Sequence, residues 1–257
     1  MEKAEIRLIE PESSQKQEWK GSIVIFPGGG YEWHSPREAE PVAKAFGDAG
    51  WKPWILYYPV KKSESDGLCL GLDPLRCGAE AVKQVRASLP EKPVIVCGFS
   101  AGGHVAASLG VHWNDESIFT KEEQAVIRPD GMVLCYPVIT SGAWTHQGSI
   151  EKLAGENKDL SAYFSLESYV NFRTPPAFLW HTASDESVPV QNSLLFVEKL
   201  AKEKVPFELH IYPKGPHGLS LATKEVEEPA KGRLADPHVA GWFEQCLQWL
   251  ESSYCTR

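Results

Sequence analysis

The sequence lacks the features that would connect it to a membrane, to secretion or to a nucleic acid. No apolar run reaches the ~18 residues of a membrane-spanning helix, and residues 1–20 carry charges from the second position onward without the apolar core of a secretory signal. Lys and Arg number 26 against 34 Asp and Glu, are scattered along the chain and leave a net charge of -8. We therefore expect a cytoplasmic protein that binds neither membrane nor nucleic acid; the sequence leaves its oligomeric state open.

The sequence also lacks the cysteine patterns of a disulfide scaffold or a metal site. Its 6 cysteines form no CxxC pair and show no metal-ligand spacing. Cys97 and Cys135 lie in apolar runs, where a thiol usually acts as a small hydrophobic side chain. We therefore expect reduced cysteines and no bound metal.

Short apolar runs rich in β-branched and aromatic residues alternate with longer helical patterns. The runs predict strands at 22–27, 52–60, 93–99, 130–139, 177–182 and 207–213. The helical patterns cover 36–50, 73–89, 100–113, 190–204 and 238–253. This alternation predicts an α/β fold with a mostly parallel sheet flanked by helices, and residues 5–11 are predicted to add an antiparallel edge strand.

One stretch, residues 140–175, breaks the alternation. It is polar, dotted with aromatic residues and without a clear strand. A connection of this length inside a compact domain is usually functional or disordered. Because the chain is long enough to bury one sizeable core, we expect a single domain over 1–257, with 140–175 as a small cap-like insertion within it.

A serine lies at the junction of the predicted strand 93–99 and the helix that follows it. The sequence Gly98-Phe99-Ser100-Ala101-Gly102 matches the G-x-S-x-G nucleophile elbow, in which a strained turn exposes a serine hydroxyl. The amide of Ala101 would then lie at a helix N-terminus, which favours an anion. The alternative is a turn with a helix-capping serine. The predicted chemistry is nucleophilic acyl transfer, which needs a base, an orienter for that base and an oxyanion hole.

The segment FPGGGYEW, residues 26–33, follows the first parallel strand. A glycine triplet at a strand end exposes backbone donors, so we expect the amides of Gly29 and Gly30 to join Ala101 in an oxyanion hole. The alternative is a plain flexible loop. A phosphate-binding loop is disfavoured because no Lys-Ser/Thr pair follows the glycines.

An acid and a base are predicted after the last two predicted strands of the chain. Asp185 follows strand 177–182, with Glu186 as the rival carboxylate, and His217 lies in a Gly- and Pro-rich loop after strand 207–213. Turn and capping roles are the alternative for Asp185. Among the competing histidines, His181 and His210 fall within predicted strands, and His104 and His112 fall on the helix after the serine. The order Ser…Asp…His is that of α/β-hydrolases. We therefore predict Ser100, Asp185 and His217 as a catalytic triad.

Four segments together give the chain a family resemblance: residues 26–46, 97–109, 174–196 and 206–223. They resemble the small bacterial carboxylesterases near the hormone-sensitive-lipase and feruloyl-esterase-like groups, whose members are often described as acetyl esterases or acetyl xylan esterases. The resemblance implies an α/β-hydrolase fold and a serine esterase without cofactor. Many relatives have His-Gly-Gly-Gly in the oxyanion loop, whereas Pro27 stands at the histidine position here.

The expected substrate is a small-molecule or oligosaccharide ester with a short acyl group. Acetyl fits the resemblance, and acetylated xylo- or manno-oligosaccharides are candidate substrates. An aromatic wall against a sugar or aryl group is expected from Tyr31, Trp33 and Tyr163, together with Trp144 and Phe164. The alternative for each of these residues is packing in the core or the cap.

Two other functions share these motifs. An amidase, such as an arylformamidase, or a peptidase would use the same triad, although a peptidase would be expected to carry a gating domain for which residues 1–20 leave no room. A catalytically silent hydrolase fold that only binds a ligand would usually lack a triad member or an oxyanion glycine, and every member is present here.

Overall fold

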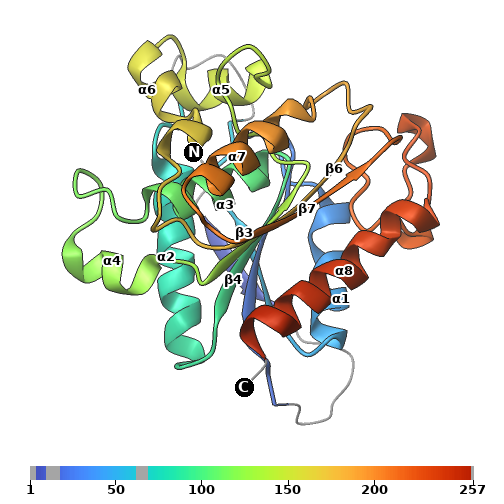
Figure 1. Cartoon of the computed structure of the whole chain (residues 1–257), viewed down its shortest axis with the longest axis horizontal. Helices are drawn as coiled ribbons and strands as arrows, with labels where there is room; N and C mark the ends of the chain where they lie inside the picture. The colour runs from blue at the N-terminus through green and yellow to red at the C-terminus, as the bar shows by residue number, and fades with distance from the viewer. Residues whose placement is uncertain (1–3, 10–17, 62–68, 256–257) are drawn as a thin grey trace.

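The computed structural model describes residues 4–9, 18–61 and 69–255. Seven strands of this part of the chain form one sheet in the order β1-β3-β2-β4-β5-β6-β7 (Figure 1). The strands are β1 (Glu5–Leu8), β2 (Ser22–Phe26), β3 (Lys52–Tyr57), β4 (Val94–Phe99), β5 (Gly131–Cys135), β6 (Ala177–Thr182) and β7 (Phe207–Tyr212). Every pairing from β3 to β7 is parallel. The predicted mostly parallel α/β fold is confirmed.

The edge strand β1 pairs antiparallel with β3, with Glu5 opposite Tyr57 and Leu8 opposite Trp54. The antiparallel edge strand predicted over 5–11 is therefore confirmed over Glu5–Leu8, and its last two positions lie outside the described residues. Its alternating half-exposed pattern contrasts with β2, β4, β5 and β6, in which every residue is buried.

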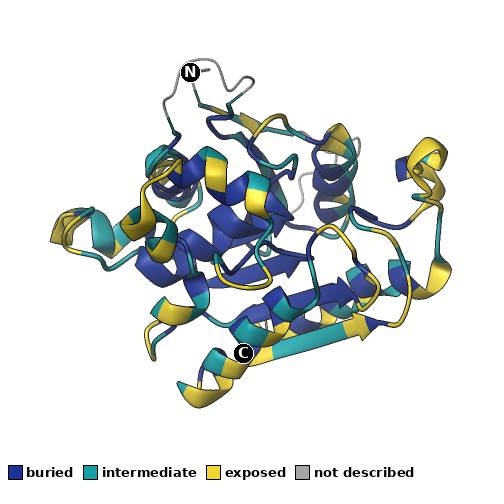
Figure 2. Ribbon diagram, turned by 90° about the horizontal axis from the view of Figure 1, so that it is seen from above, coloured by how far each residue is buried: buried dark blue, intermediate teal, exposed yellow. Residues whose placement is uncertain are grey.

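Helices pack on both faces of the sheet, and Figure 2 shows the central strands buried between them. The helices are α1 (Glu40–Asp48), α2 (Asp73–Ser88), α3 (Ala101–His112), α4 (Lys121–Ile127), α5 (Gln147–Ala154), α6 (Lys158–Tyr163), α7 (Gln191–Lys202) and α8 (Pro237–Tyr254). Apolar residues of α1 and α8 form one core with Ile23 and Ile25, whereas α2, α3 and α7 share the other with Val24 (Figure 1). Successive side chains of a strand point to opposite faces of the sheet. Because both faces are covered by helices, a central strand must be apolar at every position, and continuous apolar runs therefore predicted these strands correctly.

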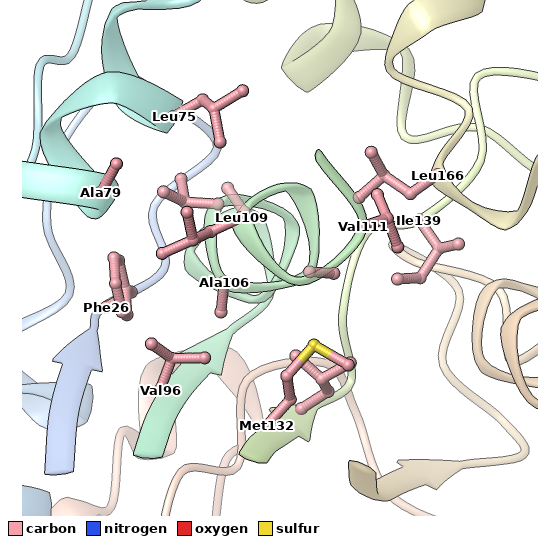
Figure 3. Close-up of a cluster of buried hydrophobic side chains, with 14 of the residues drawn as sticks. Phe26, Leu75, Ala79, Val96, Ala106, Leu109, Val111, Met132, Ile139 and Leu166 are labelled. Atoms are coloured by element: carbon pink, nitrogen blue, oxygen red, sulfur yellow. The ribbon is translucent and has the colours of Figure 1, made fainter. Parts of the chain in front are cut away.

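The helix α3, which begins next to Ser100, is buried over its whole length. Figure 3 shows Ala106 and Leu109 on this helix among side chains from the strands and from α2. A helix that is apolar all round is buried within a protein core, and α3 therefore places Ser100, the residue before its first turn, against the core.

Predicted and observed elements differ at three places near the site. The helix predicted over 36–50 is broken: a 3₁₀ turn (Pro36–Glu38) precedes α1, with the break at Ala39. The strand predicted over 130–139 ends at Cys135, because Tyr136 adopts a left-handed φ of 38°. The segment 140–175 contains α5, α6 and a 3₁₀ turn (Leu166–Tyr169), helices that the polar sequence did not predict.

The helix α4 was also missed. It begins with a capping box in which the Glu123 amide donates to the Thr120 hydroxyl oxygen and the Thr120 amide donates to the Glu123 carboxylate. This pair satisfies two amides that would otherwise lack partners in the first turn. The Thr-x-x-Glu signal was present, but the helix is too short to show an apolar period.

Candidate active site

The site lies where the strand order reverses. From β2 the chain crosses to β3 on one side, and β4 pairs with β2 on the other. In open parallel sheets such a switch point leaves a crevice at the carboxyl ends of the strands. A pocket of about 230 Å³ opens there; its lining includes Gly29, Gly30, Trp33, Ser100, His217 and Arg233.

Ser100 occupies a strained turn between β4 and α3. Its φ is 53°, a left-handed value that is rare for a residue with a side chain, and only 7% of its surface is exposed. A Cβ at Gly98 would overlap the carbonyl oxygen of Gly102, and a Cβ at Gly102 would overlap that of Phe26. The two glycines therefore allow the strand and the helix to approach closely enough to form the turn.

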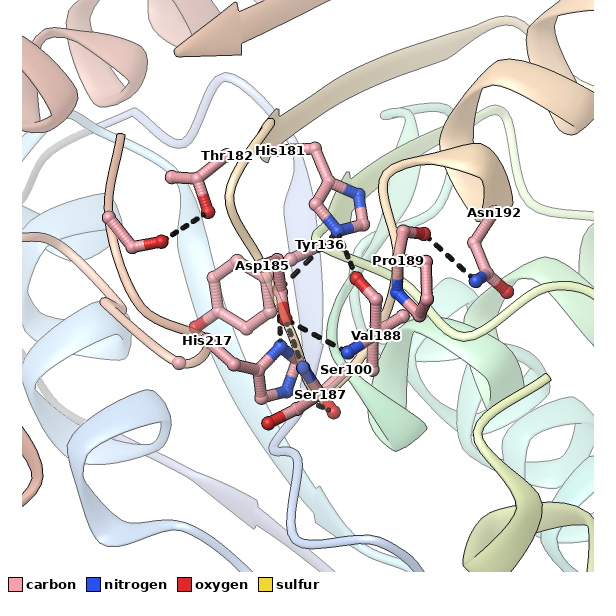
Figure 4. Close-up of polar contacts among 12 residues, drawn as sticks. Ser100, Tyr136, His181, Thr182, Asp185, Ser187, Val188, Pro189, Asn192 and His217 are labelled. Carbon is pink, nitrogen blue, oxygen red and sulfur yellow. Dashed lines mark hydrogen bonds and ion pairs between the residues drawn. The ribbon is translucent and has the colours of Figure 1, made fainter. Parts of the chain in front are cut away.

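The structure brings Ser100, His217 and Asp185 together (Figure 4). Nε2 of His217 lies 2.8 Å from Oγ of Ser100, and Nδ1 of the same ring lies 2.6 Å from Oδ2 of Asp185. The three residues come from loops after β4, β6 and β7, and parallel strands place these loops at one edge of the sheet. With Nδ1 donating to the carboxylate, Nε2 is left as the acceptor for the serine hydroxyl.

Asp185 is held as an ionised carboxylate. Its Oδ1 accepts the amides of Ser187 and Val188, each at 2.9 Å, and Nε2 of His181 lies 3.4 Å from Oδ2. Burial alone would raise the pKa of this carboxyl group, but hydrogen bonds from His181 and His217 and from the Val188 amide outweigh burial and lower the pKa well below its ordinary value. The rival carboxylate Glu186 is exposed.

The glycine loop after β2 has a shape that only glycine adopts easily. Gly29 and Gly30 have φ values of 132° and 63°, and both line the pocket. Among the described residues, no acceptor bonds to the amides of Gly29, Gly30 or Ala101. The Gly28 amide, in contrast, donates to Oε2 of Glu38 at 2.8 Å.

Of the three aromatic residues expected to bind substrate, the structure places only Trp33 at the pocket. It lines the pocket, is 44% exposed and has the Lys231 ammonium 5.7 Å from its ring centre. Trp144 is also exposed but is not among the lining residues.

The expectation for Tyr31 is wrong. Its side chain is 1% exposed, and its hydroxyl lies 2.8 Å from Nδ1 of His104 in the core. Its backbone has a positive φ of 61°, and its side chain does not line the pocket.

The expectation for Tyr163 is also wrong. Its ring stacks on His112 at the far end of α3, with 4.0 Å between ring centres, and its hydroxyl donates to Asp115. Phe164 is buried against His104. Both residues attach the segment 140–175 to α3. Tyr163 does so at His112, about 12 residues along the helix from Ser100, and at ~1.5 Å per residue this contact is far from the serine.

Sequence reasoning missed several polar residues around the pocket. Arg233 donates from Nε to the carbonyl oxygen of His217 at 2.8 Å. His146, from the segment 140–175, lines the pocket, and burial together with the nearby His217 lowers its pKa. Glu38 is buried and lines the pocket as well. None of these residues lies in a motif, and only the folded chain brings them to the serine.

Within the described part of the chain, no group of three or more His, Cys, Asp or Glu side chains is arranged to hold a metal ion. No described helix is long and apolar enough to cross a membrane. The six cysteines, all described, form no disulfide with one another.

The chain is similar to several known hydrolases. It is 37% identical to an acetyl ester-xyloside bifunctional hydrolase from Caldicellulosiruptor lactoaceticus, with a TM-score of 0.79 over 96% of this chain and 87% of that one. It is 26% identical to the carboxylesterase Cest-2923 from Lactobacillus plantarum, with a TM-score of 0.81 over 97% and 92% of the two chains.

A longer relative is an endo-1,4-beta-xylanase B from Butyrivibrio fibrisolvens, 38% identical over 211 residues. The match covers 79% of this chain but only 33% of that protein, so the chain spans about a third of its length. The model of the prolyl oligopeptidase family matches residues 75–248, which include Ser100, Asp185 and His217. With an α/β-hydrolase sheet and a family match over most of its length, the chain belongs to the prolyl oligopeptidase family.

Proposed function

We propose that the protein is a serine esterase that hydrolyses short-chain acyl esters, acetyl esters above all, through an acyl-enzyme. The observation that carries the proposal is the hydrogen-bonded series from Asp185 through His217 to Ser100. It opens into a pocket beside backbone amides that have no partner among the described residues. The similarity to a carboxylesterase and to an acetyl ester-xyloside hydrolase supports ester chemistry over other reactions of the fold.

In the first step, Oγ of Ser100 attacks the ester carbonyl carbon while Nε2 of His217 takes the hydroxyl proton. The Asp185 carboxylate stabilises the imidazolium that forms. His217 then gives the proton to the departing alcohol, and an acyl-serine remains. A water molecule repeats the cycle: His217 removes its proton, the hydroxide adds to the acyl carbon, and the proton returns to Ser100 as the carboxylic acid leaves.

The charge on the carbonyl oxygen is placed in a hole formed by the amides of Gly29, Gly30 and Ala101. These donors have no described partner to give up, so they need no reorganisation when the oxyanion forms. The Ala101 amide is also at the first position of α3, where the helix dipole favours negative charge. Pro27, at the position of the histidine of many relatives, leaves this set of backbone donors intact.

The alcohol side of the substrate is proposed to be a xylo- or manno-oligosaccharide that stacks on Trp33. An exposed indole at the pocket edge offers an apolar face to a sugar ring. We also propose the segment 140–175 as a small cap within a single domain over 1–257. Its His146 lines the pocket, and the Trp144 carbonyl oxygen accepts from Asn192 Nδ2 at 2.9 Å, which attaches the cap to α7.

A fluorophosphonate probe and a substrate panel test this function. The panel contains p-nitrophenyl acetate, butyrate and octanoate, the amide p-nitroacetanilide and acetylated xylo- and manno-oligosaccharides. We expect the probe to label the wild type, and acetate esters to be cleaved faster than octanoate and far faster than the anilide. Ser100→Ala should lose labelling and on the order of 10⁶-fold in kcat, whereas Ser88→Ala, whose hydroxyl bonds only within α2, should retain both.

Each failure has its own meaning. Faster cleavage of octanoate would contradict the short acyl group. Faster cleavage of the anilide would favour an amidase or peptidase, the chemistry that the family name suggests. Absence of labelling in the wild type would overturn the hydrolase function and favour a fold that only binds its ligand.

A further inference from the structure

Glu38 is a buried carboxylate with a different polar partner on each oxygen. Only 4% of its surface is exposed. Its Oε2 accepts the Gly28 amide at 2.8 Å, and its Oε1 accepts the Tyr136 hydroxyl at 2.7 Å. The first partner begins the glycine loop of the site, and the second follows β5. A single side chain therefore connects two segments that are far apart in the sequence.

Tyr136 extends this connection to the loop that carries the base. Its hydroxyl accepts the amide of Ser220 at 3.0 Å, and its ring meets the His217 imidazole edge-on, with 5.0 Å between ring centres. Figure 4 shows Tyr136 beside His217 and Asp185. Burial, reinforced by the Glu38 carboxylate, raises the pKa of Tyr136 well above its ordinary value, so the hydroxyl keeps its proton and donates to Glu38.

The glycine at position 28 is a requirement of this arrangement. A Cβ there would lie 2.7 Å from Oε2 of Glu38 and 2.9 Å from the carbonyl oxygen of Phe99. The left-handed φ of 38° at Tyr136 is a second unusual backbone feature at the same contact. Strained backbone persists where the surrounding structure over-determines it, and it gathers at functional sites.

Stability alone does not explain Glu38. Burying a carboxylate is costly unless it is paired, and among the described residues no Lys, Arg or His forms an ion pair with Glu38. Its partners are a neutral amide and a neutral phenol. Two charge-assisted hydrogen bonds are, however, short and directional, which suits a group that holds two loops at a set distance.

We propose that Glu38 and Tyr136 are positioning residues that align the oxyanion loop with the catalytic base. The inference rests on the proposed function, and it concerns residues outside the triad and the oxyanion hole. Glu38 sets the place of Gly28, and with it the amides of the next two residues, while Tyr136 sets the His217 ring and the Ser220 amide. The brace (Glu38 and Tyr136) therefore stabilises the tetrahedral intermediate more than the bound ester.

Kinetics of Glu38→Gln, Tyr136→Phe and the double variant test the brace. Gln has one oxygen and one NH₂ group, so it cannot present an acceptor to both the Gly28 amide and the Tyr136 hydroxyl. Phe keeps the ring of Tyr136 but removes its hydroxyl. We expect each single change to lower kcat roughly 10- to 100-fold with KM within about twofold. The double variant should be hardly worse than the poorer single one, because both changes break the same connection. The affinity for a methyl trifluoromethyl ketone, which forms a tetrahedral adduct with the serine, should fall by the same factor as kcat.

Tyr212→Phe is the matched control. Like Tyr136, Tyr212 is a buried tyrosine at the end of a strand, and its hydroxyl donates to one side chain, that of Gln245. Its ring also packs on Trp180. Its hydroxyl touches neither Glu38 nor the site, so full activity is expected. Amide hydrogen exchange gives a readout that needs no turnover: exchange at Gly28 should rise in Glu38→Gln, and exchange at Ser220 should rise in Tyr136→Phe.

The outcomes separate the inference from the proposed function. Faster exchange with an unchanged kcat, or a fall in kcat matched by Tyr212→Phe, would overturn the brace and leave the esterase intact. A wild type that neither cleaves acetate esters nor takes the fluorophosphonate would overturn the proposed function itself. If Glu38→Gln does not fold, Tyr136→Phe alone decides, because it leaves the shape of the core unchanged.

Discussion

The Nδ1 atom of His217 and the Oδ2 atom of Asp185 lie 2.6 Å apart, and the other carboxylate oxygen is occupied by two backbone amides. The carboxylate is therefore held from behind and can present only one oxygen to the imidazole. Such an arrangement fixes both the tautomer and the orientation of the ring. The acid is therefore a position at which the site can be tested without touching the serine.

Asp185→Asn should lower kcat about 10⁴-fold with little change in KM, because an amide at this position favours the wrong imidazole tautomer. The measurement is steady-state hydrolysis of p-nitrophenyl acetate. Glu186→Gln, a neighbouring and exposed carboxylate, is the control and should retain wild-type activity. Equal losses in the two variants would mean that the acid has been assigned incorrectly.

Gly102 and Gly241 should respond in opposite ways to substitution by alanine. Gly102→Ala would force a Cβ onto the Phe26 carbonyl oxygen, and we expect the free energy of unfolding to fall by about 3 kcal/mol or more. Gly241→Ala places its Cβ in open space on α8, and should stabilise the protein by about 0.5–1 kcal/mol. Urea unfolding measures both. A neutral Gly102→Ala would show that strand and helix can separate at the elbow.

Acid should destabilise the fold partly through His104. Burial lowers the pKa of this histidine from 6.5 to about 4, so between these pH values the unfolded chain binds more protons than the folded one. The free energy of unfolding therefore falls as the pH drops from 6.5 to about 4, and the lost stability, about 3 kcal/mol, does not return below that.

His104→Gln removes this titration while keeping an acceptor for Tyr31 and a donor for the Phe164 carbonyl oxygen. Urea unfolding at several pH values between 7 and 4.5 should show a shallower decline for the variant than for the wild type. Parallel declines would show that His104 does not contribute to the acid sensitivity.

Trp33→Ala should raise KM for acetylated oligosaccharides about tenfold, in line with the loss of one stacked ring of roughly 1–1.5 kcal/mol. KM for a small ester such as ethyl acetate should stay unchanged. Trp144→Ala is the matched control, since its exposure is 46% against 44% for Trp33 but it does not line the pocket. A rise in KM for Trp144→Ala instead would place the sugar over the cap.

Much of the fold followed from local patterns. The strands β2, β4, β5 and β6 are continuous apolar runs because both of their faces are covered. The strands β3 and β7 are only partly buried, and the bounds of all six were predicted to within a few residues. The positions of Ser100, Asp185 and His217 after β4, β6 and β7 were also predictable, since parallel strands bring their carboxyl ends to one edge. The structure places the three side chains within hydrogen-bond distance, and their roles remain predictions for the experiments above.

The residues that were misjudged or missed depend on contacts that no local pattern encodes. Tyr31 and Tyr163 are aromatic residues in polar surroundings, but their burial is decided by how α3 meets the glycine loop and the segment 140–175. In the sequence, Glu38 is a charged residue near the start of the predicted helix 36–50, a position that is typical of the surface. It turns inward because the backbone breaks at Ala39 and because Gly28 leaves room for a carboxylate.

The hydroxyl of Ser100 and the imidazole that faces it are separated by 117 residues of chain. During translation Ser100 therefore leaves the ribosome long before His217, and a nascent chain that ends before β7 contains the proposed nucleophile without the proposed base. Contacts of such long range form late in folding. Under the proposed mechanism, reactivity toward esters requires β7 to dock, and a chain that ends before β7 is expected to be inactive toward esters.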